Sequence, residues 1–333
     1  MSEAAVTSNQ TFSLGDLKNL TDGDMLRVNQ VITDNLASEV VLINQLSQHI
    51  ILSGGKRLRP MMVILAAKAC HYQAEDDALL AAVIEFIHTA TLLHDDVVDD
   101  SEMRRGQQTA STIWGNEAAV LVGDYLYSRA FQMMVEVGSL PIMDIYAETT
   151  NIIAEGEVLQ LLACHNADAS EEDYLAVIRA KTAKLFEAAA RVGSVLNGSS
   201  PSVQEAFAAY GRHLGTAYQL VDDLLDYQGT SADIGKNVGD DLAEGKPTLP
   251  LIHAMRNGNA TQTRMVRGAI EEGGRDRIAE VLRAVESTGA IAYTSRAAHA
   301  EAALAATALE EIPGSAYRDA LQTLAVFSVE RSF

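Results

Sequence analysis

The sequence has 333 residues, of which 48% are hydrophobic and only 5% aromatic, and its formal net charge at pH 7 is −20. This charge excludes nucleic acid and anionic membrane surfaces as general partners, so an anionic substrate would need local cations or bound metal. The two cysteines are too few for a disulfide framework or a zinc cluster. We expect Cys70 and Cys164 to be free, buried thiols in a reducing compartment.

The first 13 residues are polar and lack the apolar stretch of a signal peptide, so we expect a mobile N-terminal tail. We find no apolar run that reaches the roughly 18 to 20 residues needed to span a bilayer. The sequence therefore predicts a cytoplasmic protein that is not an integral membrane protein.

Apolar residues recur at helical spacing over residues 14–52 and predict two helices. A Ser53-Gly54-Gly55 break follows, and Pro60 suits the first turn of the next helix. A strongly apolar helix is expected over residues 76–100. The next two helices, 117–137 and 141–162, carry few charges, which indicates central positions in a bundle.

Ser170 and Asp173 predict a capping box for a helix that runs to residue 195. Ser200 and Pro201 predict the start of another, which reaches residue 227. The polar, Asp-rich stretch 229–247 is too long for an ordinary helix connection and is expected to be a functional loop. Residues 249–333 are expected to be helical, with breaks at 273–274, 289 and 313–314. Since no strand alternation stands out, we expect residues 14–333 to form one all-α domain.

An acidic cluster ends the apolar helix over residues 76–100. Asp95 and Asp99 are four positions apart and would share one helix face, with Asp96 beside them. Anions at a helix C-terminus are disfavoured by about 0.3 to 1 kcal/mol each. Because packed carboxylates repel one another unless a cation lies between them, the cluster predicts a metal site.

The same Asp-Asp-x-x-Asp spacing recurs at Asp222, Asp223 and Asp226, again after an apolar helical run. One such cluster could be a solvated helix end, but two copies favour a pair of facing carboxylate sets. Oxygen ligands without nearby cysteine select Mg²⁺, which usually completes its shell with water and substrate phosphate. Several Mg²⁺ ions and a phosphorylated substrate are therefore expected.

Cationic residues lie beside the glycine breaks and the acidic motifs. Any one of them could be a solvated surface charge, but together they favour phosphate binding, since Arg grips phosphate with two hydrogen bonds and Lys supplies point charge. They are Lys56, Arg57, Arg59, Arg104, Arg105, Lys181, Lys236 and Lys246.

These motifs together resemble the trans-type polyprenyl diphosphate synthases, over most of the chain from about residue 30. The resemblance rests on residues 54–60 (GGKRLRP), the two aspartate motifs, Arg104-Arg105-Gly106, Lys181-Thr182 and residues 235–241 (GKNVGDD). Within the family, residues 86–94 and 156–160 are most similar to bacterial octaprenyl diphosphate synthases.

The resemblance implies an all-α fold of antiparallel helices around a deep central cavity, and a homodimer. It also implies a prenyltransferase of isoprenoid biosynthesis. Such an enzyme condenses isopentenyl diphosphate sequentially onto an allylic primer, here farnesyl diphosphate. The expected product is octaprenyl diphosphate, for the side chain of a quinone such as ubiquinone.

The resemblance further assigns roles to residues. Asp95, Asp96, Asp99, Asp222 and Asp223 would hold Mg²⁺ on the allylic diphosphate, with Asp226 acting through water or a neighbouring cation. Arg104, Lys181, Lys236 and Lys246 would contact that same diphosphate, and Lys56, Arg59, His88 and Arg105 would bind isopentenyl diphosphate. Thr182 and Gln219 would offer oxygen dipoles to the carbocation formed when the allylic C–O bond ionises. His94 is expected to be structural.

Ala90 and Thr91 lie one turn before the first aspartate motif and are small, where short-chain members carry bulky aromatics. We therefore expect an open channel beneath the aspartates for the growing chain. Its floor could be formed by Met133, Met134, Met143 or Tyr146, or these could be ordinary core residues.

Three other functions remain open. The same chemistry could give another product length between C20 and C50. A class I terpene cyclase also ionises diphosphates, but generally lacks a segment like residues 54–60 and carries a different second metal motif. An inactive regulatory subunit of a heteromeric synthase usually loses aspartates, whereas this chain keeps all six.

Overall fold

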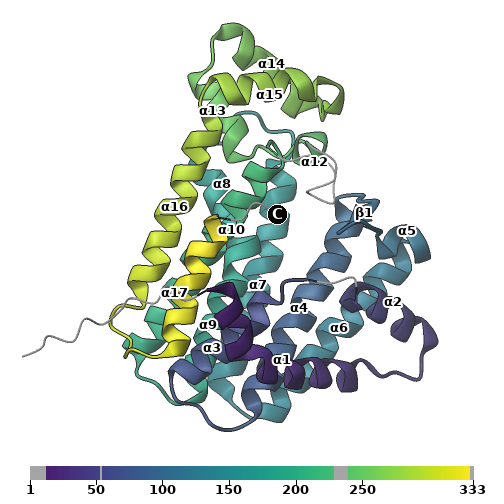
Figure 1. Ribbon diagram of the computed structural model, residues 1–333. Helices are drawn as coiled ribbons and strands as arrows, with labels where there is room; N and C mark the ends of the chain where they lie inside the picture. The colour runs from purple at the N-terminus through teal and green to yellow at the C-terminus, as the bar shows by residue number, and fades with distance from the viewer. Residues whose placement is uncertain (1–12, 53–54, 229–238, 331–333) are drawn as a thin grey trace, which may run out of the picture.

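The computed structural model describes residues 13–52, 55–228 and 239–330 (Figure 1). Helices make up nearly all of this part of the chain, as the sequence predicted. The elements in order are α1 (Leu14–Leu36), α2 (Val41–Leu52), α3 (Leu58–Ala69), α4 (Asp76–Val98), β1 (Met103–Arg104), β2 (Gln107–Gln108), α5 (Ala110–Trp114), α6 (Asn116–Val137), α7 (Leu140–Ala163), α8 (Glu171–Ile178), a π-helical turn (Arg179–Ala183), α9 (Lys184–Leu196), α10 (Pro201–Leu225), α12 (Asp240–Ala243), α13 (Leu249–Asn257), α14 (Ala260–Glu272), a 3₁₀ turn (Arg275–Arg277), α15 (Ile278–Ser287), α16 (Ala290–Ala308) and α17 (Ala316–Val329).

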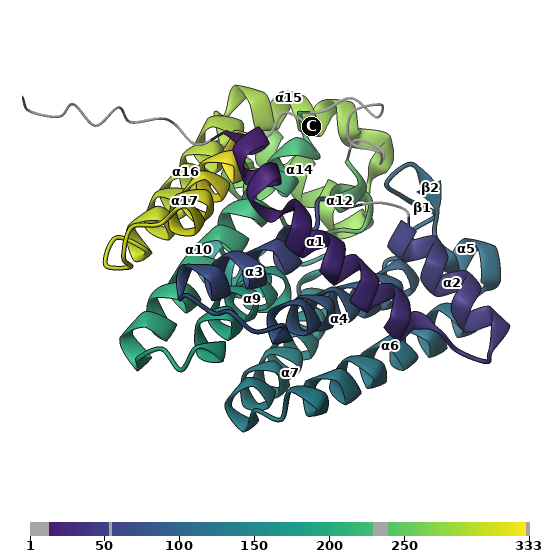
Figure 2. The same ribbon diagram turned by 60° about the horizontal axis from the view of Figure 1, so that its bottom comes forward.

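Helix α4 is the core of the bundle and carries the first aspartate motif at its end. It packs against α1, α3, α6 and α9, and α1 crosses it at one end (Figure 2). By length and composition alone α4 could cross a membrane, which the sequence had not led us to expect. In its most apolar window, 72% of the residues are buried inside the protein, so neighbouring helices cover its apolar surface.

A second group of helices faces α4 and carries the second motif. Helices α8 and α9 are joined by the π-helical turn into one long segment that packs against α7 and α10. Helix α10 also packs along α16. The predicted caps at Ser170 and Ser200 are both present, each side chain accepting a hydrogen bond from the third residue of its helix.

Helices α13 to α15 form a smaller lobe at one end of the molecule (Figure 1). This lobe has its own hydrophobic cluster, which includes Leu242 of α12 and Tyr227 just after α10. The cluster anchors the described part of the segment that precedes α13, residues 239–248. That segment carries Lys246, one of the cations predicted to bind diphosphate.

Several expectations need correction. The hairpin β1–β2 was missed, because its two-residue strands are too short to show an alternating pattern. Helices α6 and α7 form as predicted but are not central: they lie at an edge of the molecule in Figure 2 and expose large apolar side chains. Both cysteines are free, but only Cys70 is buried, while Cys164 is partly exposed. The predicted tail, apart from Ser13, lies outside the described residues.

Candidate active site

A cavity of about 760 Å³ lies between the acidic ends of α4 and α10. Its wall also includes the segment before α3, the β1–β2 hairpin, the π-helical turn and the residues just before α13. The sequence therefore predicted the segments that meet here, although they are separated by up to about 190 positions along the chain.

In the first motif, Asp95 and Asp99 face the cavity and are each paired with a lysine. Lys181 Nζ lies 3.5 Å from Asp95 Oδ1, and Lys246 Nζ lies 3.0 Å from Asp99 Oδ2. Burial acts to lower the pKa of both lysines, but the surrounding carboxylates outweigh it and raise their pKa values. Both lysines are therefore charged at neutral pH, and both line the cavity.

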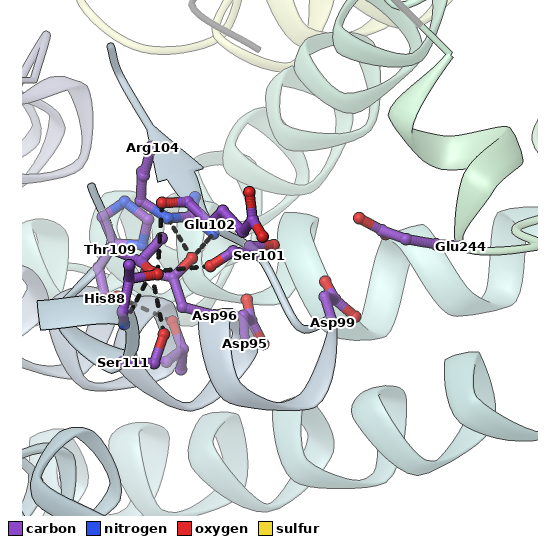
Figure 3. Close-up of polar contacts among 12 residues, drawn as sticks. His88, Asp95, Asp96, Asp99, Ser101, Glu102, Arg104, Thr109, Ser111 and Glu244 are labelled. Atoms are coloured by element: carbon purple, nitrogen blue, oxygen red, sulfur yellow. Dashed lines mark hydrogen bonds and ion pairs between the residues drawn. The ribbon is translucent and has the colours of Figure 1, made fainter. Parts of the chain in front are cut away.

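Asp96 does not lie where a metal ligand was predicted, at the wall of the cavity. Its side chain is 2% exposed and is not part of the cavity wall. Arg104 approaches it with Nε at 2.7 Å and Nη2 at 2.6 Å from the same Oδ1 atom. Figure 3 shows Asp96 joined to Arg104, while Asp99 points towards the side from which Glu244 enters. The helix periodicity placed Asp96 beside its neighbours but could not show that it turns towards the hairpin.

The hairpin directs its two arginines to different places. Arg105 (φ 53°) and Gly106 (φ 75°) form its turn, and positive φ at both central positions suits the twist of a tight hairpin. Arg104 reaches back to Asp96, whereas Arg105 lies against Gly55, where an added Cβ would come 2.9 Å from its Nη1. The two arginine side chains therefore reach different parts of the protein, Asp96 and Gly55.

In the second motif, Asp222 is exposed at the cavity wall, and the next two aspartates are buried. Asp223 accepts hydrogen bonds from Tyr174 Oη at 2.6 Å and from Gln219 Nε2 at 2.7 Å. Asp226 accepts one from the backbone N–H of Asp241 at 3.3 Å. Burial, together with the charge of Asp241, raises the pKa of Asp223 to about 7 and that of Asp226 to about 8.

Lys181 and Thr182 lie in the π-helical turn, a feature that is frequent at functional sites. Two glycines let neighbouring helices approach this turn closely. A Cβ at Gly156 of α7 would lie 2.7 Å from Lys181 N, and one at Gly215 of α10 would lie 2.6 Å from Ala183 Cα. Glu157, beside Gly156, accepts from Lys181 Nζ at 2.7 Å. Burial, with the nearby charge of Asp95, raises the pKa of Glu157 to about 7.

A basic pocket lies across the cavity from the lysines. Burial and neighbouring arginines hold the pKa of His88 well below its usual value, so its neutral ring can accept from Arg59 Nη1 at 3.1 Å. The Arg59 guanidinium also stacks over the Phe186 ring, 4.2 Å from its centroid. Glu85 is buried and pairs with Arg57. His88 therefore orients Arg59 as well as lining the pocket.

The polyprenyl synthetase family profile matches residues 40–287 of this chain. This chain belongs to the polyprenyl synthetase family. It is 51% identical to octaprenyl diphosphate synthase of Escherichia coli (strain K12) over 320 residues, covering 96% of this chain and 99% of that protein. Members of this family elongate prenyl chains in the trans configuration, adding isopentenyl diphosphate to allylic diphosphates, so this chain is a prenyltransferase of isoprenoid biosynthesis.

Solved structures of family members have the same all-helical fold. A polyprenyl synthase from Caulobacter crescentus CB15, complexed with calcium and isoprenyl diphosphate, superposes with a TM-score of 0.93 at 44% identity and covers 97% of this chain and 99% of its own. A decaprenyl diphosphate synthase from Rhodobacter capsulatus gives a TM-score of 0.90 at 42% identity, with 95% and 98% covered. The predicted family and fold class are therefore confirmed.

The cavity wall brings together most of the site residues predicted from the family motifs. They are Lys56, Arg59, His88, Thr91, Asp95, Asp99, Arg104, Arg105, Lys181, Thr182, Gln219, Asp222, Asp223, Asp226 and Lys246. Asp96 is turned towards Arg104, Ala90 is fully buried away from the wall, and Lys236 lies outside the described residues.

The wall residues that the sequence reasoning missed include Glu85, Glu157, Tyr174 and Asp241. Glu157 and Asp241 lie inside stretches that carried the family resemblance, so their position could have signalled them. Glu85 and Tyr174 gave no such signal, because an acid or a tyrosine in an apolar helix is not distinctive by itself.

The fit of a divalent cation can be judged from these donors. Among the residues that the structure describes, no three His, Cys, Asp or Glu side chains gather closely enough to hold a metal by themselves. Each aspartate motif nevertheless offers carboxylate oxygens and no thiolate or imidazole, the donor set of hard cations that take further oxygens from water and phosphate. The residues thus fit a metal bound together with substrate diphosphate.

Proposed function

We propose that this prenyltransferase makes octaprenyl diphosphate from farnesyl diphosphate and isopentenyl diphosphate, in the cytoplasm, for the side chain of a quinone such as ubiquinone. The supporting observation is the 51% identity to an octaprenyl diphosphate synthase along nearly the whole of both chains. Because a relative named for a decaprenyl product is 42% identical, product length is the part of this proposal that needs its own test.

The allylic diphosphate would bind between the two motifs. Arg104, Lys181 and Lys246 supply positive charge there. The motif that contains Lys236 predicts that this lysine contacts the same diphosphate. Divalent cations, several Mg²⁺ ions by the donor set, would be held by Asp95, Asp99 and Asp222, with Asp226 behind them. Asp96 and Asp223 were also predicted as metal ligands, but Asp96 accepts from Arg104, and Asp223 accepts from Tyr174 and Gln219. Such cations supply charge that neutralises the departing diphosphate.

Isopentenyl diphosphate would bind in the basic pocket formed by Lys56, Arg59 and Arg105, with His88 orienting Arg59. The allylic C–O bond would ionise first, and the double bond of isopentenyl diphosphate would then attack the allylic carbocation. A proton would leave the new chain and be taken up by the released diphosphate. The oxygens of Thr182 and Gln219 lie in the same wall and would stabilise the positive carbon. The cavity must exclude water at this stage, because water would convert the cation to an alcohol.

Growth of the chain would follow the wall at Thr91. This side chain lies in the cavity wall one turn before Asp95, whereas Ala90 is fully buried in the core. We therefore propose Thr91 as the residue that borders the channel and Ala90 as a spacer behind it. Met133, Met134 and Tyr146 are also fully buried, in keeping with core positions or a closed floor.

Product analysis tests this function. Purified protein with farnesyl diphosphate, labelled isopentenyl diphosphate and Mg²⁺ is expected to give a C40 product. A product that ends at C15 or C20 would contradict the length, and no product from the purified chain would favour a regulatory subunit. Thr91→Tyr is expected to shorten the product while turnover continues, and Ala90→Ser, a small change behind the wall, is the matched control.

We also propose a homodimer in which α6 and α7 of two copies pack together. These helices expose large apolar side chains: Leu121 is 67% exposed, Leu140 77%, Leu161 63% and Leu162 72%. Extended apolar surface of this kind is typical of protein interfaces. Sedimentation is expected to show a dimer that Leu161→Lys dissociates. Leu304→Lys, at a leucine of α16 that is 50% exposed, should leave the dimer intact.

A further inference from the structure

Tyr174 is a buried side chain of the cavity wall that none of the recognised motifs includes. It lies on α8, is 6% exposed and donates to Asp223 Oδ2 at 2.6 Å. The other oxygen of Asp223 accepts from Gln219 Nε2 at 2.7 Å. Gln219 Oε1 in turn accepts from Thr182 Oγ1 at 2.9 Å. A continuous chain of hydrogen bonds thus runs from α8 through α10 to the π-helical turn.

The direction of every hydrogen bond in this chain follows from chemistry. Gln219 places its NH₂ group against Asp223 and its carbonyl oxygen against Thr182. An amide NH₂ only donates and an amide oxygen only accepts. The hydroxyl hydrogen of Thr182 is then used towards Gln219. As a result, the lone pairs of Thr182 Oγ1 are directed away from Gln219 and are free to face a positive centre in the cavity.

The two ends of the chain are held by different structures. Helix α8 begins with a complete capping box at Ser170 and Asp173, which fixes the first turn from which Tyr174 projects. At the other end, Gly156 and Gly215 allow close backbone contacts that hold the turn carrying Thr182. Between them, each oxygen of the buried Asp223 carboxylate is held by one hydrogen bond, from Tyr174 and from Gln219.

We propose that Tyr174 is a positioning residue: by occupying one oxygen of Asp223, it fixes Gln219 and thereby keeps the lone pairs of Thr182 on the developing allylic cation. This inference rests on the proposed roles of Thr182 and Gln219 in stabilising that cation. This role differs from substrate binding. Tyr174 acts through Asp223 and Gln219, and the resulting interaction stabilises the allylic cation but not the bound substrate.

Tyr174→Phe removes the hydroxyl and keeps the ring, so steady-state kinetics can test the proposal. We expect kcat to fall about 10-fold, with both KM values within about twofold of wild type, because a hydrogen bond felt mainly in the transition state changes kcat. Tyr72→Phe is the matched control, since Tyr72 is 9% exposed and donates to Asp76 at the same 2.6 Å, at the far end of α4. It should leave kcat unchanged.

A double-mutant cycle separates positioning from a general structural effect. Thr182→Val removes the hydroxyl at the end of the chain. In that background Tyr174→Phe should cost little more, whereas in Thr182→Ser it should again lower kcat about 10-fold. Effects that multiply in the Thr182→Val background, a normal kcat for Tyr174→Phe, or a change confined to KM would each overturn the proposal.

Two further measurements keep the test decisive. Unfolding temperatures of the single variants show whether Tyr174→Phe and Tyr72→Phe perturb the fold equally. If Tyr174→Phe is too unstable to assay, Gln219→Met breaks the same chain at its centre. It should lower kcat by at least as much, because it also removes the Gln219 oxygen, and a normal kcat there would overturn the proposal. Failure of the proposed function would instead appear in the wild-type protein, as absence of any prenyl product.

Discussion

The two aspartate motifs have the same spacing but lie in opposite surroundings. The first motif has a cation within 3.5 Å of each of its three aspartates: Lys181, Arg104 and Lys246. In the second, Asp223 and Asp226 are hydrogen-bonded by a hydroxyl, an amide and a backbone N–H, and a further carboxylate, Asp241, lies nearby. Each aspartate of the first motif has a cationic side chain beside it, whereas Asp223 and Asp226 are buried near a further carboxylate, which raises their pKa values.

This difference suggests that the same Asp-Asp-x-x-Asp pattern serves to orient the diphosphate at one site and to bind metal at the other. The first motif can orient a diphosphate with its lysines before any metal arrives, since both lysines are held charged. The buried motif raises the pKa of Asp226 to about 8, so its carboxylates become fully ionised near neutral pH only when a cation compensates them. We infer that dependence on metal is concentrated at the end of α10.

The largest predicted effect comes from removing the cavity-facing aspartates of either motif. Asp95→Asn and Asp222→Asn should each lower kcat by about 1,000-fold or more, because each removes charge that stabilises the departing diphosphate. Asp100→Asn is the control: it is exposed beside the first motif at φ 50°, a conformation that Asn tolerates. Comparable activity of Asp95→Asn and Asp100→Asn in a product assay would contradict the site.

A smaller loss is predicted for Asp96→Asn, and it should have a different origin. Asp96 anchors Arg104, so the variant should lower kcat/KM about 100-fold through misplacement of the hairpin that carries Arg104 and Arg105. Hydrogen exchange of residues 103–108 should be faster in Asp96→Asn and unchanged in Asp95→Asn. Equal exchange in the two variants would mean that Asp96 does not hold the hairpin.

The sequence could predict the helices, because apolar periodicity and cap residues are local signals. It could predict that the two motifs meet, because the same aspartate spacing recurs after two apolar helical runs. It could not show that Asp96 turns to Arg104, since side-chain direction near a helix end depends on a hairpin formed by later residues. It also missed Tyr174, whose partner Asp223 is 49 positions away. The central placement expected for α6 and α7 failed because few charges can also mean an apolar outer face.

The contrast in buried charge predicts a pH-dependent effect of metal on stability. The pKa of Asp226 is about 8 in the folded protein against 3.8 for an unperturbed aspartate, so the folded state holds extra protons between these values. Without metal, stability should therefore fall as the pH rises from about 4 to about 8. Mg²⁺ should raise the unfolding temperature by several degrees at pH 8 and by much less at pH 5.5.

The control for this measurement is Asp226→Asn, which should reduce the pH-dependent fall in the metal-free protein. Sodium chloride at equal ionic strength should not replace Mg²⁺, since general screening acts weakly on buried groups. A metal effect of equal size at both pH values would contradict the difference drawn between the two motifs.

The smallest effect concerns the backbone that brings Lys181 to the first motif. Gly156→Ala would place a Cβ 2.7 Å from the backbone nitrogen of Lys181, so the π-helical turn must shift, at a cost of about 1 to 3 kcal/mol. Gly23→Ala in α1 meets nothing within 4 Å and should instead stabilise the protein by about 0.5 to 1 kcal/mol. Denaturant unfolding measures both. If the turn positions Lys181, Gly156→Ala should also raise KM for the allylic diphosphate, while its KM for isopentenyl diphosphate, bound by residues outside the turn, stays constant.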